Sequence, residues 1–313
     1  MESKSAPADD GEEKVSRIAA FRRWFSEPFK FKTTMLFLIP PLVFAFIFIL
    51  YPLSEVIYLS FTYYTGFLSP VWIGLTNYHT LLGDPVLSIS LVNNIIWVVV
   101  FLVLNNFLGL MLAGSIDIMG RKLSSFFRVV LYLSVLLPTV AISYLFLALY
   151  SPEIGLIDAF FKDVGLTALS KTDFLGNPSL TLYSVLGSSI WQYAAFPMLI
   201  FIAAFASINP SLYEAAVIDG ANQWQIFWRI KVPIIRPVIV TMLALTYIWN
   251  SQPFSQIYTM TKGGPGNASQ VLVSYLYQTA YSGLRIGYAS AIAILIFLII
   301  FPVAIVFFRT FEK

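Results

Sequence analysis

Cysteine is absent from the sequence, and histidine occurs once, as His79. Without cysteine, the chain forms neither disulfide bridges nor thiolate metal sites. One histidine without a neighbouring cluster of carboxylates is too little to hold zinc. His79 lies in the segment NYHTLLGD, where a loop or packing role is favoured over that of a general base. Neither metal nor thiol chemistry is therefore expected.

Charged residues are scarce as well. They make up 11% of the 313 residues, whereas a soluble domain averages about 25%. Hydrophobic residues account for 58% of the chain, and the mean hydropathy is +0.79. A single water-soluble core stops growing near this chain length and cannot bury so much apolar sequence. A large soluble enzyme is excluded, and an integral membrane protein is predicted.

Sequence signals of energy coupling are also missing. No G-x-x-x-x-G-K-[ST] phosphate loop occurs, so ATP hydrolysis is not expected on this chain. No ionisable residue falls at mid-depth of the apolar runs, which disfavours a proton relay or a charged-ion pathway. The alternative of an ion-coupled secondary transporter predicts such carboxylates and an inverted repeat, and neither is found. A membrane enzyme is disfavoured because no acid–base constellation occurs, and no catalytic residue is predicted.

What the sequence does contain is long, continuous apolar runs. A transmembrane β-barrel would show short alternating segments instead, so the spans are predicted to be helices. We predict an all-α protein with six transmembrane helices, at 34–60, 92–116, 126–150, 181–207, 236–259 and 286–308. They form one domain, 33–313, preceded by a cytoplasmic tail, 1–32, that shows no cleavable signal. Residues 14–30 of the tail have the pattern of an interfacial amphipathic helix, the alternative being a charged lead-in.

Basic residues are distributed unevenly between the two ends of these spans. The outer loops hold only four of the 19 Lys and Arg residues, namely Lys162, Lys171, Lys262 and Arg285. An excess of Lys and Arg marks the cytoplasmic side of a membrane protein. Both termini are therefore predicted in the cytoplasm, and the protein in the cell membrane (inner or plasma). The net charge of +3 reflects this topology and does not support nucleic-acid binding.

Uncharged polar residues gather in the fourth and fifth spans, each beside a proline. The fifth span contains TYIWNSQPFSQ with Pro253, and the fourth contains GSSIWQYAAFP with Pro197. Pro253 removes a backbone donor and predicts a kinked or loosened helix. Buried amides and hydroxyls without partners are costly in hydrocarbon, so these groups are expected to face protein or a wet cavity.

Two interpretations of this polar cluster stay open. Aromatic rings beside amides suit a sugar, which offers both hydroxyls and apolar faces, and the two prolines favour such a cavity slightly. The alternative is interhelical hydrogen bonding that holds the bundle together. In the second span, Asn105 and Asn106 are assigned to packing, whereas Asn93 and Asn94 are ambiguous.

The loop at 208–236 is longer than a turn between two spans requires. Asn209 is a good N-cap and Pro210 a good first helical residue, while Gly220 can end the helix in a left-handed turn. A short cytoplasmic helix over 210–219 is predicted, followed by a helical stretch that ends at Pro233. Its small and apolar residues suit docking to another protein, and the alternative is a helix lying on the lipid surface.

The residues of this loop carry a family resemblance. The loop resembles the EAA loop of ATP-binding-cassette (ABC) importer permeases in its residues and their spacing. These are Glu214-Ala215-Ala216, three residues, Gly220, nine residues, Ile230, one residue and Val232-Pro233. The family pattern has leucine in place of Val232. The segments IGLTNY, WQYAAFPM, TKGGPGNAS and GYASAIAI resemble the carbohydrate branch, the maltose and glycerol-phosphate permeases. The resemblance covers about residues 35–310.

The resemblance implies the type I ABC importer permease fold and half of a translocation pathway for a sugar or sugar derivative, such as a di- or oligosaccharide. It implies a second permease subunit in a heterodimer, two ATPase subunits carrying ATP and Mg, and an extracytoplasmic sugar-binding protein, with no cofactor in this chain. Coupling to the ATPase falls to Glu214, Ala215, Ala216, Asp219 and Gly220. Contact with the sugar falls to Ser189, Gln192, Tyr193, Phe196, Thr246, Trp249 and Asn250.

Overall fold

A computed structural model describes residues 28–152, 155–165 and 172–311. Most of the predicted tail, including residues 14–27 of the expected amphipathic helix, lies outside the described residues. The chain divides into two compact units, residues 1–58 and 59–313, which are considered separately.

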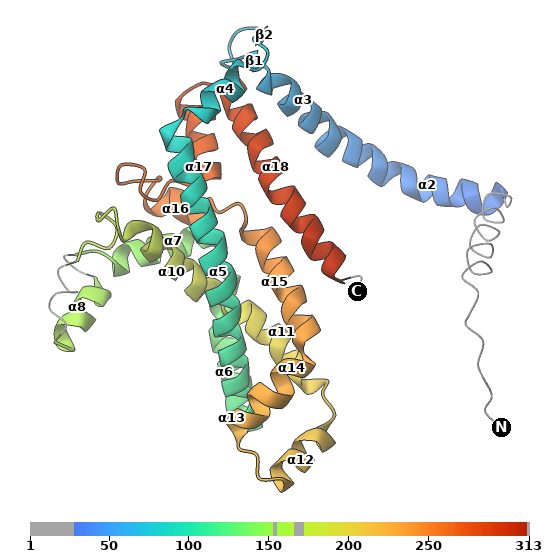
Figure 1. Cartoon of the computed structure of the whole chain (residues 1–313), viewed down its shortest axis with the longest axis vertical. Helices are drawn as coiled ribbons and strands as arrows, with labels where there is room; N and C mark the ends of the chain where they lie inside the picture. Colours follow the sequence, from blue (N-terminus) through green and yellow to red (C-terminus); the bar gives the residue numbers. More distant parts are fainter. Residues whose placement is uncertain (1–27, 153–154, 166–171, 312–313) are drawn as a thin grey trace. The chain divides into compact units, whose positions relative to one another are not determined.

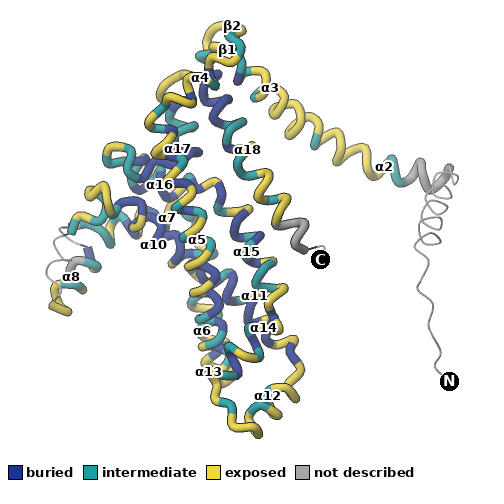
Figure 2. The backbone as a smooth tube through the Cα atoms, in the orientation of Figure 1, coloured by how far each residue is buried: buried dark blue, intermediate teal, exposed yellow. Residues whose placement is uncertain are grey.

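The described part of the first unit is a long apolar helix. It consists of α2 (Pro28–Ala45), a π-helical turn η1 (Phe46–Leu50) and most of α3 (Tyr51–Ser60). The apolar stretch runs over Thr34–Ser60, and none of the residues in its apolar window is buried (Figure 2). A helix that is hydrophobic all round yet exposes its side chains to this extent suits lipid rather than water.

The second unit opens with a short β-hairpin and a small helix, at the end of the unit opposite α12 (Pro210–Ile218; Figure 1). The hairpin pairs β1 (Thr62–Tyr63) with β2 (Val71–Trp72), an antiparallel ribbon that hydrophobic patterning did not predict. Helix α4 (Thr76–Leu82) follows, and its Asn77 donates hydrogen bonds to the carbonyls of Ser60 and Thr62. The hairpin is therefore held by side-chain contacts from the next helix.

Helix α5 (Pro85–Asp117) runs the length of the unit (Figure 1). It begins seven residues before the predicted start at 92, because Asp84 caps it: Oδ1 of Asp84 accepts hydrogen bonds from the amides of Val86 and Leu87, at 2.8 and 3.2 Å. Pro85 at the first helical position needs no hydrogen-bond partner there. A strong N-cap extended the helix beyond its apolar run.

The predicted span 126–150 is not one continuous helix. It consists of α6 (Arg121–Leu136) and α7 (Thr139–Leu149), which meet at an angle of 98°. Pro138 disfavours helical backbone at the preceding residue, and Leu137 is extended, with φ −76° and ψ 141°. The predicted third span is therefore a bent pair of helices, because Pro138 breaks the helix.

The fourth span is nearly as predicted. Helices α10 (Thr181–Tyr193) and α11 (Ala195–Ala206) run on from one another, and α8 (Leu156–Asp163) lies in the outer loop before them. The loop that follows holds α12 (Pro210–Ile218), α13 (Gln223–Ile226), a π-helical segment η2 (Phe227–Lys231) and α14 (Val232–Ile234). The prediction that this helical stretch ends at Pro233 is wrong. The break falls at Ile235, because Pro233 sits in the first turn of α14, where a proline is tolerated.

The fifth and sixth spans complete the unit. Helix α15 (Arg236–Asn250) stops before Pro253, and α16 (Ser255–Met260) resumes after it, which confirms the expected loosening at that proline. Helix α17 (Leu272–Tyr277), the π-helical turn η3 (Gln278–Ser282) and α18 (Ile286–Phe311) follow. In the described residues, four helices are long and apolar enough to span a membrane. Two bent pairs, Arg121–Leu136 with Thr139–Leu149 and Gln223–Ile234 with Arg236–Asn250, bring the number to six if each pair is one span. This agrees with the predicted all-α, six-helix transmembrane fold.

The core of the unit gathers around α5 (Figure 2). At its inner half α5 packs on α11, where a Cβ at Gly109 would lie 2.6 Å from the ring of Pro197. At mid-length, Trp97 and Phe101 pack with residues of α7, α10 and α16. At the outer end, Leu87 packs with Leu272 and Ile292. Helix α5 thus packs on α6, α10, α11, α15 and α17.

A carboxylate joins three elements at the outer end. Besides capping α5, Asp84 accepts hydrogen bonds through Oδ2 from the hydroxyls of Tyr275 and Tyr288, each at 2.5 Å. Burial alone would raise the pKa of Asp84, but the two phenols and the two backbone amides outweigh it and lower the pKa. Burial and the Asp84 contact raise the pKa of Tyr275 to about 12, so this phenol remains a donor at neutral pH.

We expect Asp84→Ala to lower the free energy of unfolding by about 2 kcal/mol, because it removes a helix cap and the acceptor that the phenols of Tyr275 and Tyr288 share. Thermal denaturation of the detergent-solubilised protein measures this. Because the pKa of Asp84 is lowered in the folded state, its contribution is complete above the unfolded pKa of about 4 and is lost as the pH falls below it. The exposed Asp173, which caps only the local amides of Leu175 and Gly176, is the control. An equal effect of Asp173→Ala would contradict the role of the phenols.

Candidate functional site

Two adjoining cavities lie between α5, α10, α11 and the end of α15. The larger holds about 270 Å³ and is lined by Phe101, Asn105, Val135, Tyr193, Phe196, Thr246, Trp249 and Asn250. The smaller holds about 150 Å³, and the residues lining it include Trp97, Thr139, Ser189, Tyr193, Trp249, Asn250 and the segment 252–257. Tyr193, Trp249 and Asn250 line both cavities. Aromatic rings and uncharged polar groups thus face the same space.

The structure brings six of the seven predicted sugar-contact residues to these cavities. Ser189 lines the smaller one, and Phe196 and Thr246 line the larger one, beside the three shared residues. The ring of Phe196 meets that of Trp249 edge to face, with centroids 5.2 Å apart. The hydroxyls of Tyr193 and Thr139 hydrogen-bond at 2.7 Å, which fixes the Tyr193 ring at the boundary between the cavities.

Gln192, the seventh, lines neither cavity. It is fully buried, and its Nε2 donates to the carbonyl of Leu137 at 3.0 Å. Its Oε1 accepts from Nε2 of Gln256, also at 3.0 Å. Gln192 therefore satisfies the carbonyl that the break before Pro138 leaves free, and it ties α10 to both broken spans. The sequence left open whether this polar cluster lines a cavity or joins the helices by hydrogen bonds. The contacts of Gln192 are of the second kind.

The break in the fifth span exposes polar backbone to the smaller cavity. After Asn250 the chain leaves the helix, and Gln252, Pro253 and Phe254 line the cavity. The break is held from α5, where Nδ2 of Asn94 donates to the carbonyl of Ser251 at 3.2 Å. Irregular backbone in a membrane protein is tolerated where it is buried in protein or lines a cavity, and both conditions hold here.

At the opposite end of the unit, α12 projects from the bundle (Figure 1). Asn209 caps it by accepting from the amide of Ser211 at 3.1 Å, and Gly220 ends it with φ +81°, both as predicted. None of its residues is buried. Glu214, Ala215, Asp219 and Gly220 are exposed, and Ala216 is half-buried. The exposed apolar side chains of Leu212, Val217 and Ile218 accompany them.

Beneath α12 lies a contact that the sequence did not suggest. Lys231 in η2 is 8% exposed and forms an ion pair with Asp117, the last residue of α5. Its ammonium also lies over the ring of Tyr213 in α12, 4.7 Å from the centroid, and 5.6 Å from that of Phe205 in α11. Burial, and then the charge of Asp117, raise the pKa of Tyr213. The ammonium of Lys231 thus contacts α5, α11 and α12. The opposite charges of Asp117 and Lys231 do not by themselves predict that the two residues pair.

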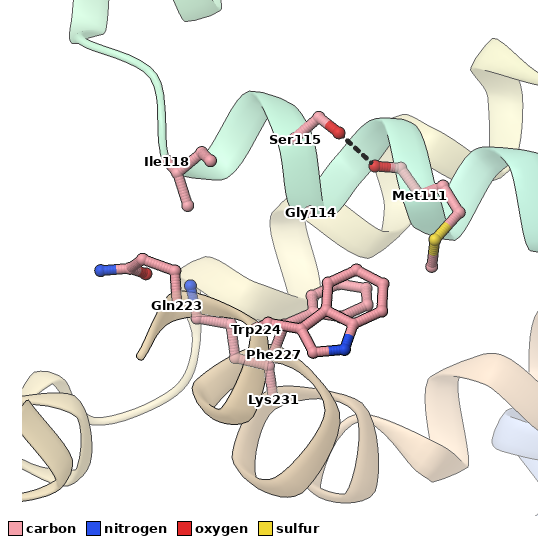
Figure 3. A pocket seen from close by; sticks show the side chains of 8 residues that line it. All are labelled: Met111, Gly114, Ser115, Ile118, Gln223, Trp224, Phe227 and Lys231. Atoms are coloured by element: carbon pink, nitrogen blue, oxygen red, sulfur yellow. Dashed lines mark hydrogen bonds between the residues drawn. The ribbon is translucent and has the colours of Figure 1, made fainter. Parts of the chain in front are cut away.

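A pocket of about 130 Å³ adjoins this ion pair (Figure 3). Met111, Gly114, Ser115 and Ile118 of the inner end of α5 form one wall, and Gln223, Trp224, Phe227 and Lys231 form the other. Among the described residues, no group of His, Asp or Glu side chains could hold a metal ion.

Comparison with known proteins gives three further findings. Residues 105–312 match a family described as the binding-protein-dependent transport system inner membrane component. The chain is 37% identical over 281 residues to the probable ABC transporter permease protein YurN of Bacillus subtilis, covering 88% of this chain and 95% of that protein. It is 31% identical to the probable starch degradation products transport system permease protein AmyD of Thermoanaerobacterium thermosulfurigenes, with 87% and 88% covered.

A solved structure has the same fold. It is a chain of a bacterial alginate ABC transporter in complex with a periplasmic protein bound to an alginate pentasaccharide. The TM-score is 0.78 at 23% sequence identity, over 91% of this chain and 96% of that one. The overall fold of this chain is therefore one already seen in a solved transporter.

Proposed function

The chain belongs to the family of binding-protein-dependent transport system inner membrane components, and we propose that it is one of two permease subunits of an ATP-driven importer for a sugar or sugar derivative. It is a multi-pass membrane protein of the ABC importer permease fold. The observation that carries the proposal is the pair of cavities in which Tyr193, Trp249 and Asn250 are shared. Amides and hydroxyls suit the hydroxyls of a sugar, and aromatic rings suit its apolar faces.

The substrate class is supported by the relatives and by the absence of charge. One relative is named for starch degradation products and the solved transporter for alginate. Among the described residues, no charged side chain lines either cavity, which favours a neutral solute over a phosphate ester. Buried polar groups confer selectivity because they are left unpaired when a solute lacks the matching hydroxyl.

The proposed assembly contains this chain, a second permease, two ATPase subunits that hold ATP and Mg, and an external sugar-binding protein. Both termini lie in the cytoplasm, and α12 docks on an ATPase subunit through Glu214, Ala215, Ala216, Asp219 and Gly220. Closure of the ATPases would draw the docked helices together and open the cavities outward, and ATP hydrolysis would reset them. This is alternating access by rigid-body movement of helix bundles.

The assembly is tested by purifying the tagged chain from gently solubilised membranes and identifying its companions by mass spectrometry. An ATPase, a second permease and a binding protein are expected. Recovery of this chain alone in several detergents, with uptake driven by an ion gradient, would instead favour a secondary transporter.

Alanine at the cavity residues tests the site. We expect Trp249→Ala and Asn250→Ala each to raise the half-saturating sugar concentration about fivefold to tenfold, because each removes a contact of about 1 kcal/mol. ATP-driven uptake into membrane vesicles measures this. Trp191→Ala is the matched control, since Trp191 is 51% exposed and packs on Phe146 but lines neither cavity. Unchanged uptake in both variants would mean that the cluster serves packing only.

A further inference from the structure

Helix α5 carries four buried asparagines, and three of them hold neighbouring elements. Asn93 donates to the carbonyls of Ala268 and Gln270. Asn94 donates to Ser251, and Asn106 donates to the carbonyl of Leu102 and to Oγ1 of Thr246. The amide nitrogen of each of the three therefore has a structural role that its contacts explain.

Asn105 is the exception. It is 3% exposed, and neither end of its amide hydrogen-bonds to a group in the described part of the chain, whereas Asn94 and Asn106 leave only Oδ1 unpaired. Leaving a buried polar group unpaired costs about 1–3 kcal/mol, so such groups call for an explanation. Asn105 lines the larger cavity, which its neighbour Asn106 does not. Among the four asparagines, Asn105 therefore combines an amide without hydrogen bonds with a place in the cavity lining.

A second unpaired group lies two turns away on the same face. Trp97, Phe101 and Asn105 are spaced by four residues, which places them in one row along the helix. Trp97 is 2% exposed, its Nε1 has no partner within the described residues, and it lines the smaller cavity. Its ring stacks on Phe101, with centroids 6.5 Å apart, and Phe101 lines the larger cavity. The row therefore has the indole of Trp97 at one end, the amide of Asn105 at the other and Phe101 between them. Its residues line both cavities.

We propose that this row of α5 is a wall of the solute pathway, and that Asn105 hydrogen-bonds a hydroxyl of the translocated solute. Trp97 donates to an oxygen of the same solute, or of the solute at its next position. The proposal rests on the function proposed above and adds the second span to a site that the sequence analysis placed on the fourth and fifth. The solute class is a neutral polyhydroxylated compound, because an amide oxygen, an indole donor and aromatic faces meet without charge.

Labelling locates Asn105 independently of the solute. Because the chain has no cysteine, an Asn105→Cys variant in the complete transporter can be modified at that one position of this chain by 2-aminoethyl methanethiosulfonate. We expect modification in membrane vesicles, detected by mass spectrometry of the chain. Asn106→Cys, one residue away and turned into the bundle, is the matched control and is expected to stay unmodified. No modification of Asn105→Cys, or equal modification of both, would overturn the proposal.

Stability and affinity separate contact with the solute from a structural role. Asn105→Leu removes the unpaired amide at similar volume, so the thermal stability of the purified complex is expected to stay equal or to rise. The half-saturating concentration for uptake is expected to rise about fivefold to tenfold, with maltose, cellobiose and melibiose as the sugars tested. Asn93→Leu is expected to do the reverse, lowering stability with little change in affinity. Lower stability with unchanged affinity for Asn105→Leu would overturn the proposal.

The labelling experiment and the uptake measurements distinguish failure of the role proposed for Asn105 from failure of the proposed function on which it rests. If the wild-type transporter takes up none of the sugars in the presence of ATP, the proposed sugar substrate is contradicted, while labelling still decides whether position 105 faces the pathway. If wild type takes up a sugar and Asn105→Leu has the same half-saturating concentration, the proposed function stands and the role of Asn105 is rejected.

Discussion

Replacing Gly220 with arginine is expected to reduce ATP-driven uptake at least tenfold while the chain still inserts into the membrane. Gly220 ends α12 with φ +81°, and no atom lies within 4 Å of the position a Cβ would take. A side chain there strains the backbone by only about 1–2 kcal/mol, too little to unfold the bundle. An arginine would, however, project from the exposed end of α12, the proposed docking helix. Glu214→Lys, which reverses a charge on the same helix, is expected to act in the same direction.

Gly74 is the matched control for Gly220→Arg. It also has a positive φ, +62°, and nothing within 4 Å of its Cβ position, but it lies in the outer loop before α4. Gly74→Arg therefore imposes a similar backbone strain without touching α12, and near-normal uptake is expected. Co-purification of the ATPase with each variant separates lost docking from lost insertion. Normal uptake in both Gly220→Arg and Glu214→Lys would contradict the docking role of α12.

Removing the cation at the base of α12 is expected to have the second large effect. Lys231→Met leaves the carboxylate of Asp117 without its partner, and losing one member of a fully buried pair costs about 3–5 kcal/mol. Because Asp117 remains partly exposed to solvent, we expect a loss of about 2 kcal/mol in stability. The contact with the Tyr213 ring is lost at the same time, so uptake is expected to fall as well.

A double variant tests the reason for this loss. Asp117→Asn combined with Lys231→Met removes both charges, and it is expected to recover most of the stability that Lys231→Met loses. Lys122→Met, an exposed lysine at the start of α6, is the control and is expected to change stability little. Thermal denaturation of the complex measures all three. If the double variant is no more stable than Lys231→Met, the ion pair between Lys231 and Asp117 is not what stabilises the contact between α5 and α12.

The position of Lys231 suggests how movement of α12 would reach the membrane helices. Its ammonium lies between the carboxylate at the end of α5 and the Tyr213 ring of α12. Helix α5 in turn carries Trp97 and Asn105, which line the two cavities. The ion pair and one rigid helix therefore form a continuous physical connection from the proposed docking helix to the proposed solute pathway.

Much of this architecture was predictable from short stretches of sequence. The apolar runs predicted six spans, Asn209 and Gly220 predicted the limits of α12, and Pro253 predicted the break in the fifth span. Each of these depends on a residue and its neighbours along the chain: the length of an apolar run, a capping side chain, or a proline that lacks its N–H. Pro138 carried the same kind of local signal for the 98° bend.

The identity of the groups at the site was decided only by tertiary structure. Gln192 and Tyr193 are adjacent in sequence, yet one is buried between broken helices and the other lines both cavities. Asn105 and Asn106 were assigned to packing alike, but only Asn106 has bonding partners. Asp117 and Lys231 pair across 114 positions of sequence. Local sequence sets where a helix begins and ends, whereas the partner of each side chain depends on how helices distant in sequence rotate and pack against one another.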